Sequence, residues 1–196
     1  MNRFAITGGI ACGKSTVGAG MERLGWQVID TDVLARRLLE PEGAAYEKVV
    51  DSFGQSILNE SGLIDRSLLG EIVFNDPAKR SLLNSILHPL IRAEWQSSHS
   101  LFIQHGPTLI VIPLLFETGI ETWFQSVACV GCSLERQRER LAGRGLKNRQ
   151  AEQRIAAQWP MEEKLKRSHL VLWNDGSMEL LEQQIRLLDS RWKRNL

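Results

Sequence analysis

Five short apolar segments, separated by longer stretches of helical periodicity, set the plan of this 196-residue chain. Continuous apolar runs rich in β-branched residues are typical of parallel strands that are buried on both faces. We expect strands at 4–7, 26–29, 108–112, 127–132 and 169–173. Elsewhere apolar residues recur every three or four positions, which predicts helices at 15–24, 33–39, 134–142, 149–158, 161–167 and 178–192. Strands that alternate with helices indicate an α/β fold with a parallel sheet.

The region from Glu40 to Ser100 differs from the rest because it contains no strong strand pattern. Pro41 and Gly43 interrupt the chain, and helical periodicity follows. Asp76 and Pro77 form an N-cap followed by a proline at the first helical position, which starts a further helix. Pro89 lies inside that helix and is expected to kink or break it. We interpret the region as a helical insertion that holds a second substrate.

The composition is that of an ordinary soluble protein, with 43% hydrophobic and 24% charged residues and a net charge of +1. Such a balance gives no overall attraction to nucleic acid or to a membrane surface. No apolar run approaches the length of a membrane span. Because the chain begins directly with a predicted strand, we expect no signal peptide and a cytoplasmic protein.

Three cysteines are too few for a disulfide framework. Cys129 and Cys132 have C-x-x-C spacing, which is compatible with a redox pair or with half of a zinc site. They lie in a predicted buried strand, however, and no second Cys/His pair accompanies them. Two buried structural thiols are therefore the favoured interpretation.

The segment between the first strand and the first helix matches the P-loop pattern G-x-x-x-x-G-K-[S/T] at Gly8, Gly13, Lys14 and Ser15. In such a loop, backbone N–H groups surround phosphate oxygens at a helix N-terminus. Lys14 is expected to contact the β- and γ-phosphates, and the Ser15 hydroxyl to contact Mg²⁺. The alternative is a glycine-rich turn that arose by chance, but the flanking strand and helix argue against it.

Two carboxylates, Asp30 and Asp32, follow the second strand. The carboxyl ends of strands are where open α/β sheets bind ligands. Either carboxylate could instead serve only to cap the next helix.

The predicted helix 134–142 is basic, and the stretch from Leu134 to Arg167 holds ten Lys/Arg against five Asp/Glu. Arg136 and Arg140 share a helix face, and Arg144 extends the row. Gly143 and Gly145 flank Arg144, so the segment has the character of a lid that closes over a triphosphate. The alternative is a solvated face on which these arginines pair with nearby glutamates.

Several motifs, in order along nearly the whole chain, resemble those of dephospho-CoA kinases. They are Thr7-Gly-Gly-Ile-x-x-Gly-Lys-Ser-Thr16, Ile29-Asp-x-Asp-x-x-Ala-Arg36, Leu87-His-Pro-Leu-Ile91, Val111-x-Pro-Leu-Leu-x-Glu117, Gln137-x-x-Arg140-x-x-x-Arg144, Arg154-Ile-x-x-Gln158 and Asn174-x-Gly176. The resemblance implies a three-layer α/β/α P-loop kinase fold with a five-stranded parallel sheet, a helical acceptor-binding insertion and a lid. The whole chain would form a single domain. Its core would comprise 1–37, 106–140 and 168–196, its insertion 38–105 and its lid 141–167.

The same resemblance implies phosphorylation of the ribose 3′-hydroxyl of dephospho-CoA by ATP with Mg²⁺, the last step of coenzyme A synthesis. The catalytic residues would be Asp32 as the base, Lys14 and Arg140. The nucleotide site would comprise Gly8, Gly9, Ile10, Ala11, Cys12, Gly13, Lys14, Ser15, Thr16, Arg140, Arg144 and Asn174, with Ser15 at the metal. The acceptor site would comprise Asp32, Arg36, His88, Pro113, Leu114 and Glu117. We expect a monomer or a weak homo-oligomer with no nucleic-acid partner.

Some positions depart from the family pattern. Ala11-Cys12-Gly13 stands where the family usually has Gly-Ser-Gly before the lysine, so Ala11 brings a Cβ close to the phosphates. Gly145 and Trp173 each replace a usual aspartate, in the lid and before Asn174. Because Cys12 lies at a helix N-terminus, which favours a thiolate, it is a candidate for modification.

Three other functions fit parts of the sequence. A different small-molecule P-loop kinase, acting on a nucleoside or nucleotide, would share the loop but differ in its acceptor. A GTPase switch would use the Asp51-x-x-Gly54 match, but this follows a helical pattern and no Asn-Lys-x-Asp follows a later strand. A nucleotide-binding scaffold without turnover would not need Asp32 beside the loop.

Overall fold

The computed structural model describes residues 3–102, 106–194 and 196, and the side chains of 98–102 lie outside the described part. The chain divides into two compact units. One comprises the residues up to Asp30 together with those from Ser98 onward, and the other comprises Thr31–Ser97. The expected end of the insertion at 105 falls outside the described residues. Each unit is described by itself.

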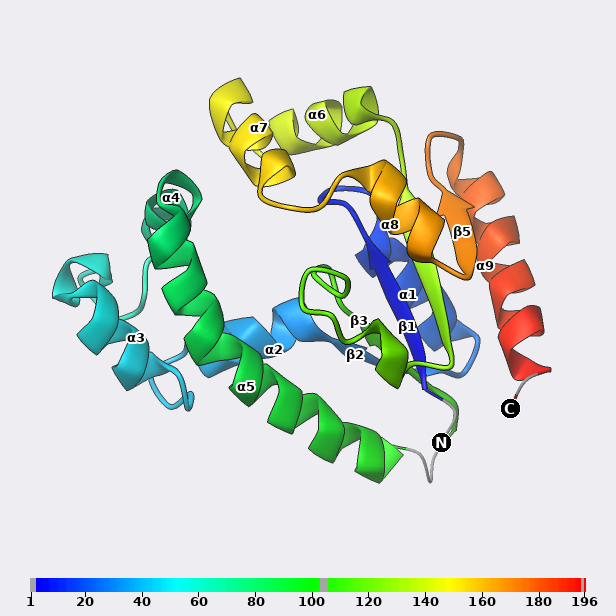
Figure 1. Cartoon of the computed structure of the whole chain (residues 1–196), viewed down its shortest axis with the longest axis horizontal. Helices are drawn as coiled ribbons and strands as arrows, with labels where there is room; N and C mark the ends of the chain where they lie inside the picture. The colour runs from blue at the N-terminus through cyan, green and yellow to red at the C-terminus, as the bar shows by residue number, and fades with distance from the viewer. Residues whose placement is uncertain (1–2, 103–105, 195) are drawn as a thin grey trace. The chain divides into compact units, whose positions relative to one another are not determined.

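The larger unit is built on a five-stranded parallel sheet (Figure 1). The strands are β1 (Phe4–Gly8), β2 (Gln27–Asp30), β3 (Thr108–Val111), β4 (Ser126–Gly131) and β5 (Leu170–Trp173). Their order across the sheet is β2-β3-β1-β4-β5. The strand β1 is therefore central, and every one of its residues is buried. All five strands predicted from the apolar runs are confirmed, with ends that shift by one residue.

Helices cover both faces of this sheet and give three α/β/α layers. The helices of the larger unit are α1 (Lys14–Arg23), α6 (Leu134–Ala142), α7 (Asn148–Ala156), α8 (Met161–Arg167) and α9 (Met178–Lys193), with a 3₁₀ turn at Glu121–Trp123. Successive side chains of a strand point to opposite faces. Ala128 and Val130 pack in the core formed with α1 and α9, whereas Cys129 lies near Lys164 of α8. The helix α8 therefore covers the opposite face.

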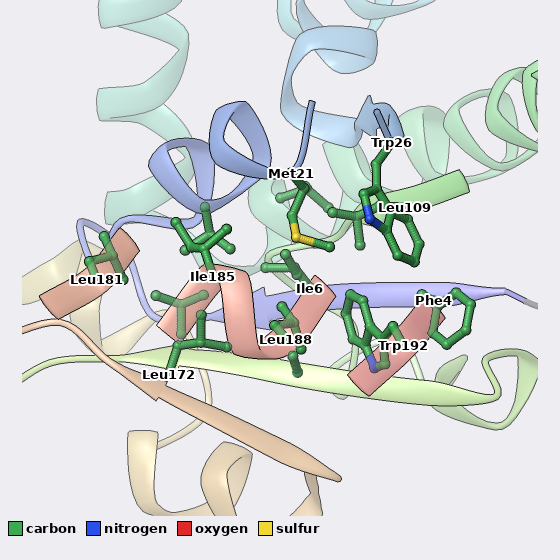
Figure 2. Close-up of a cluster of buried hydrophobic side chains, with 14 of the residues drawn as sticks. Phe4, Ile6, Met21, Trp26, Leu109, Leu172, Leu181, Ile185, Leu188 and Trp192 are labelled. Atoms are coloured by element: carbon green, nitrogen blue, oxygen red, sulfur yellow. The ribbon is translucent and has the colours of Figure 1, made fainter. Parts of the chain in front are cut away.

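The main hydrophobic core lies between the sheet and the pair α1 and α9 (Figure 2). Three aromatic rings meet there: Trp192 lies 4.9 Å from Phe4 and 5.7 Å from Trp26 between ring centroids. Met21 and Ile185 fill the space between the two helices and the central strand. This core fixes α1 against the sheet, and the loop before α1 is the P-loop.

The smaller unit is helical, as the sequence predicts. It contains α2 (Thr31–Leu38), α3 (Tyr46–Phe53), a 3₁₀ turn at Gln55–Ile57, α4 (Arg66–Asn75) and most of α5 (Pro77–Phe102). It has an apolar core of its own, which includes Val49, Ile57, Leu69 and Ile86. Within this unit, Leu58 and Ile64 form an isolated antiparallel bridge.

Two local expectations about the helices need correction. The helix α5 continues through Pro89 to Phe102, so the expected break is wrong, while the expected kink stays a prediction. A helix of 26 residues tolerates the loss of one backbone donor at the proline. The helix α2 begins at Thr31, directly after β2, so Asp32 is a residue of its first turn and not its cap. By contrast, the predicted bounds of α6 and α8 and the caps Asp76 and Ser177 are confirmed.

In the described part of the chain, no helix combines the length and the apolar character that crossing a membrane requires.

The central position of Trp192 leads to a stability prediction. The side chain is 0% exposed, and its Nε1 donates to Ser126 Oγ at 3.0 Å. Trp192→Ala should lower the free energy of unfolding by about 3–5 kcal/mol, because it leaves a large cavity. Urea unfolding followed by circular dichroism measures this. Leu187→Ala on the same helix, where the side chain is 70% exposed, is the control and should change stability by less than about 0.5 kcal/mol. Similar losses in both variants would contradict the prediction.

Candidate active site

The P-loop connects the carboxyl end of β1 to the first turn of α1 and has an unusual backbone. Gly8, Ala11 and Gly13 have φ of 142°, 60° and 103°. A Cβ at Gly8 would lie 2.1 Å from the Val130 carbonyl oxygen, and one at Gly13 would lie 2.3 Å from Asn174 Nδ2. Both positions favour glycine for their conformation, and Gly8 also requires it for space because the atom in the way belongs to the backbone.

Ala11 also has a left-handed backbone conformation, although it is not a glycine. A left-handed conformation costs an alanine roughly 1–2 kcal/mol. Its methyl group is buried against Leu141 and Ala151, with Ile10 and Ile155 packed at the edge of the same cluster. Burial of this methyl group offsets part of the strain of the left-handed conformation at Ala11.

The carbonyl groups of the loop are held by side chains that donate hydrogen bonds. Lys14 Nζ donates to Gly8 O (3.1 Å) and Gly9 O (2.8 Å), Gln137 Nε2 to Ile10 O (2.8 Å), Arg140 Nη1 to Ala11 O (3.1 Å) and Asn174 Nδ2 to Cys12 O (2.8 Å). In a planar trans peptide the N–H points away from the C=O. The N–H groups of Ala11 and Gly13 therefore point away from Gln137 and Asn174, as a phosphate cradle requires.

The arginine row of α6 is divided between two environments. Arg140 is half-buried, and its second terminal nitrogen donates to Asn174 O at 2.8 Å. Arg136 is exposed and pairs with Glu139 at 2.8 Å, and this carboxylate raises the pKa of Arg136. Arg144 is exposed in the turn between α6 and α7. The alternative of a solvated, paired face therefore describes Arg136 but not Arg140.

Asn174 lies directly beneath the P-loop, immediately after β5. Its side chain is buried among loop backbone atoms, and its backbone N–H donates to Gly131 O at 2.8 Å. The residue before it, Trp173, is the last of β5 and is exposed. The backbone of Trp173 is bonded through both its N–H and its C=O to Gln184 of α9.

Cys129 and Cys132 are buried, as predicted, and so is Cys12, but the thiol contact is not the one that C-x-x-C spacing suggests. Residues three apart in a strand point to opposite faces. The Cys132 thiol instead donates to Cys12 Sγ at 3.3 Å. This hydrogen bond lowers the pKa of Cys12 and raises that of Cys132, and the charge of Lys14 also lowers the pKa of Cys12.

Burial raises the pKa of Cys129 to about 11. Because Cys12 is fully buried, the lowering of its pKa does not by itself make the thiol accessible to modifying reagents.

The turn that follows β3 is tied to the segment around α8 by a buried ion pair. Lys164 Nζ lies 2.7 Å from Glu117 Oε1 and donates to Pro113 O at 2.9 Å. The same carboxylate oxygen accepts the N–H of Trp159 at 2.9 Å. The other oxygen, Glu117 Oε2, is buried and accepts no hydrogen bond from any described residue. Pro113 is buried and Leu114 is half-buried.

Three residues assigned to the acceptor lie in the smaller unit. Asp32 and Arg36 are exposed on α2, and His88 is half-buried on α5. Burial lowers the pKa of His88, so its imidazole is neutral at neutral pH. The P-loop residues, Arg140, Asn174 and Glu117 lie in the larger unit.

Sequence reasoning assigned no role to Gln137, Gln158 or Lys164. The two glutamines stand in motifs shared with the family, and that is the signal that marks them. The structure bonds both to Ile10: Gln137 donates to its carbonyl, and Gln158 Oε1 accepts its N–H at 2.7 Å. Lys164 has no sequence signal, because a lysine in a charged helix reads as solvent-exposed.

Ser15 is the residue assigned to the metal. It lies in the first turn of α1 and is exposed. Mg²⁺ is commonly held by few protein ligands together with substrate phosphates and water. An accessible hydroxyl at the phosphate loop fits a metal bound in that way.

Known proteins are similar to this chain in sequence and in fold. Residues 3–179 match the model of the family described as dephospho-CoA kinase. The dephospho-CoA kinase of Geobacillus kaustophilus is 42% identical over 192 residues, which cover 96% of each chain. Solved structures are similar too. TT1252 from Thermus thermophilus is 33% identical, with a TM-score of 0.78 and 97% of each chain covered. The dephospho-CoA kinase from Campylobacter jejuni is 31% identical, with a TM-score of 0.69, and the match covers 100% of this chain and 99% of that chain.

A parallel sheet with a P-loop at the end of its central strand, together with these relatives, defines a P-loop kinase. The family match covers most of the chain, and the relatives are matched over nearly their whole length. The chain belongs to the dephospho-CoA kinase family.

The buried ion pair gives a second stability prediction. Lys164 is 0% exposed and Glu117 is 15% exposed, so Lys164→Ala removes the cation from a largely buried carboxylate, which should lower the free energy of unfolding by about 3–5 kcal/mol. Lys166→Ala on the same helix removes an exposed pair with Glu162 and should cost less than about 1 kcal/mol. Urea unfolding of both variants tests this, and a loss no larger for Lys164→Ala than for Lys166→Ala would refute it.

Proposed function

We propose that this chain transfers the γ-phosphoryl group of ATP to the ribose 3′-hydroxyl of dephospho-CoA and so produces coenzyme A. The observation that carries the proposal is the family match over residues 3–179, on a chain whose P-loop is complete. Phosphoryl transfer depends on positioning and charge neutralisation and involves little covalent chemistry for the protein. The roles proposed below follow that requirement.

On the donor side, the proposed nucleotide site is the loop Gly8–Thr16 with Arg140, Arg144 and Asn174. Its backbone N–H groups surround the β-phosphate, and Lys14 moves from the loop carbonyls to the phosphates when ATP binds. Ser15 would hold Mg²⁺, which supplies charge neutralisation at the phosphates when bound. Arg140 and Arg144 add positive charge over the transferred group. Support comes from the bonds that already place Arg140 and Asn174 on the loop.

On the acceptor side, Asp32 is the proposed base that takes the proton of the 3′-hydroxyl. Arg36 and His88 would bind the acceptor, and the neutral imidazole of His88 can both donate and accept a hydrogen bond. Pro113, Leu114 and Glu117 would shape the pocket from the turn after β3. The buried second oxygen of Glu117, which no described residue satisfies, supports a polar ligand near this turn.

We also propose that the protein acts in the cytoplasm as a monomer or a weak homo-oligomer. The net charge of +1 and the balanced composition support a freely diffusing enzyme with small-molecule partners. Light scattering over a range of concentrations would measure the oligomeric state.

The direct test of function is acceptor dependence. Purified protein with ATP and Mg²⁺ should convert dephospho-CoA to CoA, measured by chromatography of the products and by ADP release. We expect ADP release to require dephospho-CoA and to be much slower with AMP or adenosine, because the rest of the acceptor supplies binding energy that is used in catalysis. Equal rates on AMP and dephospho-CoA would instead favour a nucleotide kinase.

The role of Asp32 is tested by Asp32→Asn, which keeps the shape of the side chain and removes its charge. Because general-base help contributes roughly 10²–10⁴-fold, kcat should fall by about two orders of magnitude or more. Thermal stability and ATP binding should remain close to those of the unmodified chain, since Asp32 is exposed. Asp30→Asn, two residues away, is the matched control and should cost less. Full turnover in Asp32→Asn with an inactive Asp30→Asn would show that the two roles are reversed.

A further inference from the structure

Ile10 is distinguished within the P-loop because side chains bond both of its backbone polar groups. Gln158 Oε1 accepts its N–H at 2.7 Å, and Gln137 Nε2 donates to its carbonyl at 2.8 Å. The N–H belongs to the peptide between Gly9 and Ile10, and the carbonyl belongs to the peptide between Ile10 and Ala11. Two successive peptide planes are therefore fixed, one by each glutamine.

The glutamines come from separate segments of the region between β4 and β5. Gln137 lies on α6, whereas Gln158 follows α7 and precedes α8. Both therefore link the loop to elements more than a hundred residues away in the sequence.

The burial of Gln137 fixes the position of its side-chain amide over the loop. Its side chain is 5% exposed, and a Cβ at Gly9 would lie 2.7 Å from its Nε2 and 2.6 Å from Met161 Cε. A buried amide is costly unless it is hydrogen-bonded. The amide of Gln137 thus has a fixed place over the loop.

The residue that follows Ile10 is the one whose backbone is strained. Ala11 has φ of 60°, and this conformation turns the chain into the segment that leads to Gly13 and α1. A strained backbone persists where surrounding contacts hold it. Fixing both peptides around Ile10 sets the direction in which the chain enters that turn.

We propose that Gln137 and Gln158 are positioning residues for phosphoryl transfer, which hold Ile10 so that the following N–H groups meet the phosphates of ATP. The proposal rests on the proposed use of ATP at the P-loop. Neither glutamine is a catalytic residue, because both act through the backbone of the loop.

The two hydrogen bonds run in opposite directions, and this gives a sharp test. A glutamate in place of Gln158 still accepts the Ile10 N–H, whereas a glutamate in place of Gln137 places an acceptor against the Ile10 carbonyl. Both changes place a carboxyl group beside the same residue, so the difference between Q137E and Q158E reports the direction of the hydrogen bond. The uncharged variants Q137M and Q158M control for repulsion of ATP by the added charge.

The experiment measures binding of a non-hydrolysable ATP analogue with Mg²⁺ by calorimetry, and KM and kcat with dephospho-CoA. Loss of a hydrogen bond that leaves a buried group unsatisfied corresponds to a change in affinity of roughly 10-fold to 100-fold. Q137E should therefore bind the analogue more weakly than Q158E by that factor. The KM for ATP should rise in parallel, with a smaller change in the KM for dephospho-CoA. If Q137E does not fold, Q137M and Q158M, which remove each bond without adding charge, should both weaken analogue binding by about 10-fold.

Equal analogue affinities for Q137E and Q158E would overturn the proposal, as would unchanged affinity in both methionine variants. A merely structural role would lower the melting temperature of these variants without a selective change in the KM for ATP, and that outcome also counts against it. Failure of the unmodified chain to convert dephospho-CoA would concern the proposed function instead, because analogue binding does not depend on the acceptor.

Discussion

The interaction on which the rest of the site depends is the hydrogen bonding of the P-loop carbonyls. A loop with three residues at positive φ does not hold its shape by local preference alone. Here each carbonyl from Gly8 to Cys12 accepts a hydrogen bond from a side chain, and those side chains come from α1, α6 and the end of β5. Because a peptide N–H points away from its C=O, fixing the carbonyls orients the donors for an anion. The bonds from Gln137, Arg140 and Asn174 thus orient part of the proposed anion site in advance, which reduces the reorganisation that binding requires. Lys14, by contrast, is proposed to leave its two carbonyls when ATP binds.

The region between β4 and β5, all of which the structure describes, carries many charged side chains that reach solvent and only two buried polar ones, Gln137 and Lys164. Arg140 bonds to two backbone carbonyls, while its neighbours Arg136 and Arg138 pair with Glu139 and Glu152 on the surface. Surface pairs of this kind contribute little to stability. The excess positive charge of the segment therefore has different uses along one helix: part of it is balanced in solvent, and part is directed at the loop. The same contrast between a buried and an exposed cation exists on α8. Lys164 is buried and pairs with Glu117, whereas the nearby Lys166 is exposed.

The sequence predicted the features that depend on local patterns. Apolar runs located all five strands, helical periodicity located α6 and α8, and the fixed P-loop positions located the loop between β1 and α1. It could not predict features that arise only in three dimensions. The Cys12–Cys132 contact joins residues 120 apart, and strand geometry excludes the C-x-x-C pair that spacing suggested. Likewise, nothing local marks Lys164 as buried, and continuation of α5 through Pro89 depends on helix on both sides of the proline. The residue roles assigned to the acceptor remain predictions, because they followed from resemblance.

Support for the phosphate loop is contained in the larger unit. Every side chain that bonds to a loop carbonyl lies there, as do the glutamines at Ile10, whereas Asp32, Arg36 and His88 lie in the smaller unit. The smaller unit also has a hydrophobic core of its own. The residues proposed for the acceptor are instead divided between the units, because Pro113, Leu114 and Glu117 lie in the larger one. The hydrogen bonds that hold the phosphate loop thus belong to one unit, so a change in the separate core of the smaller unit need not disturb the loop.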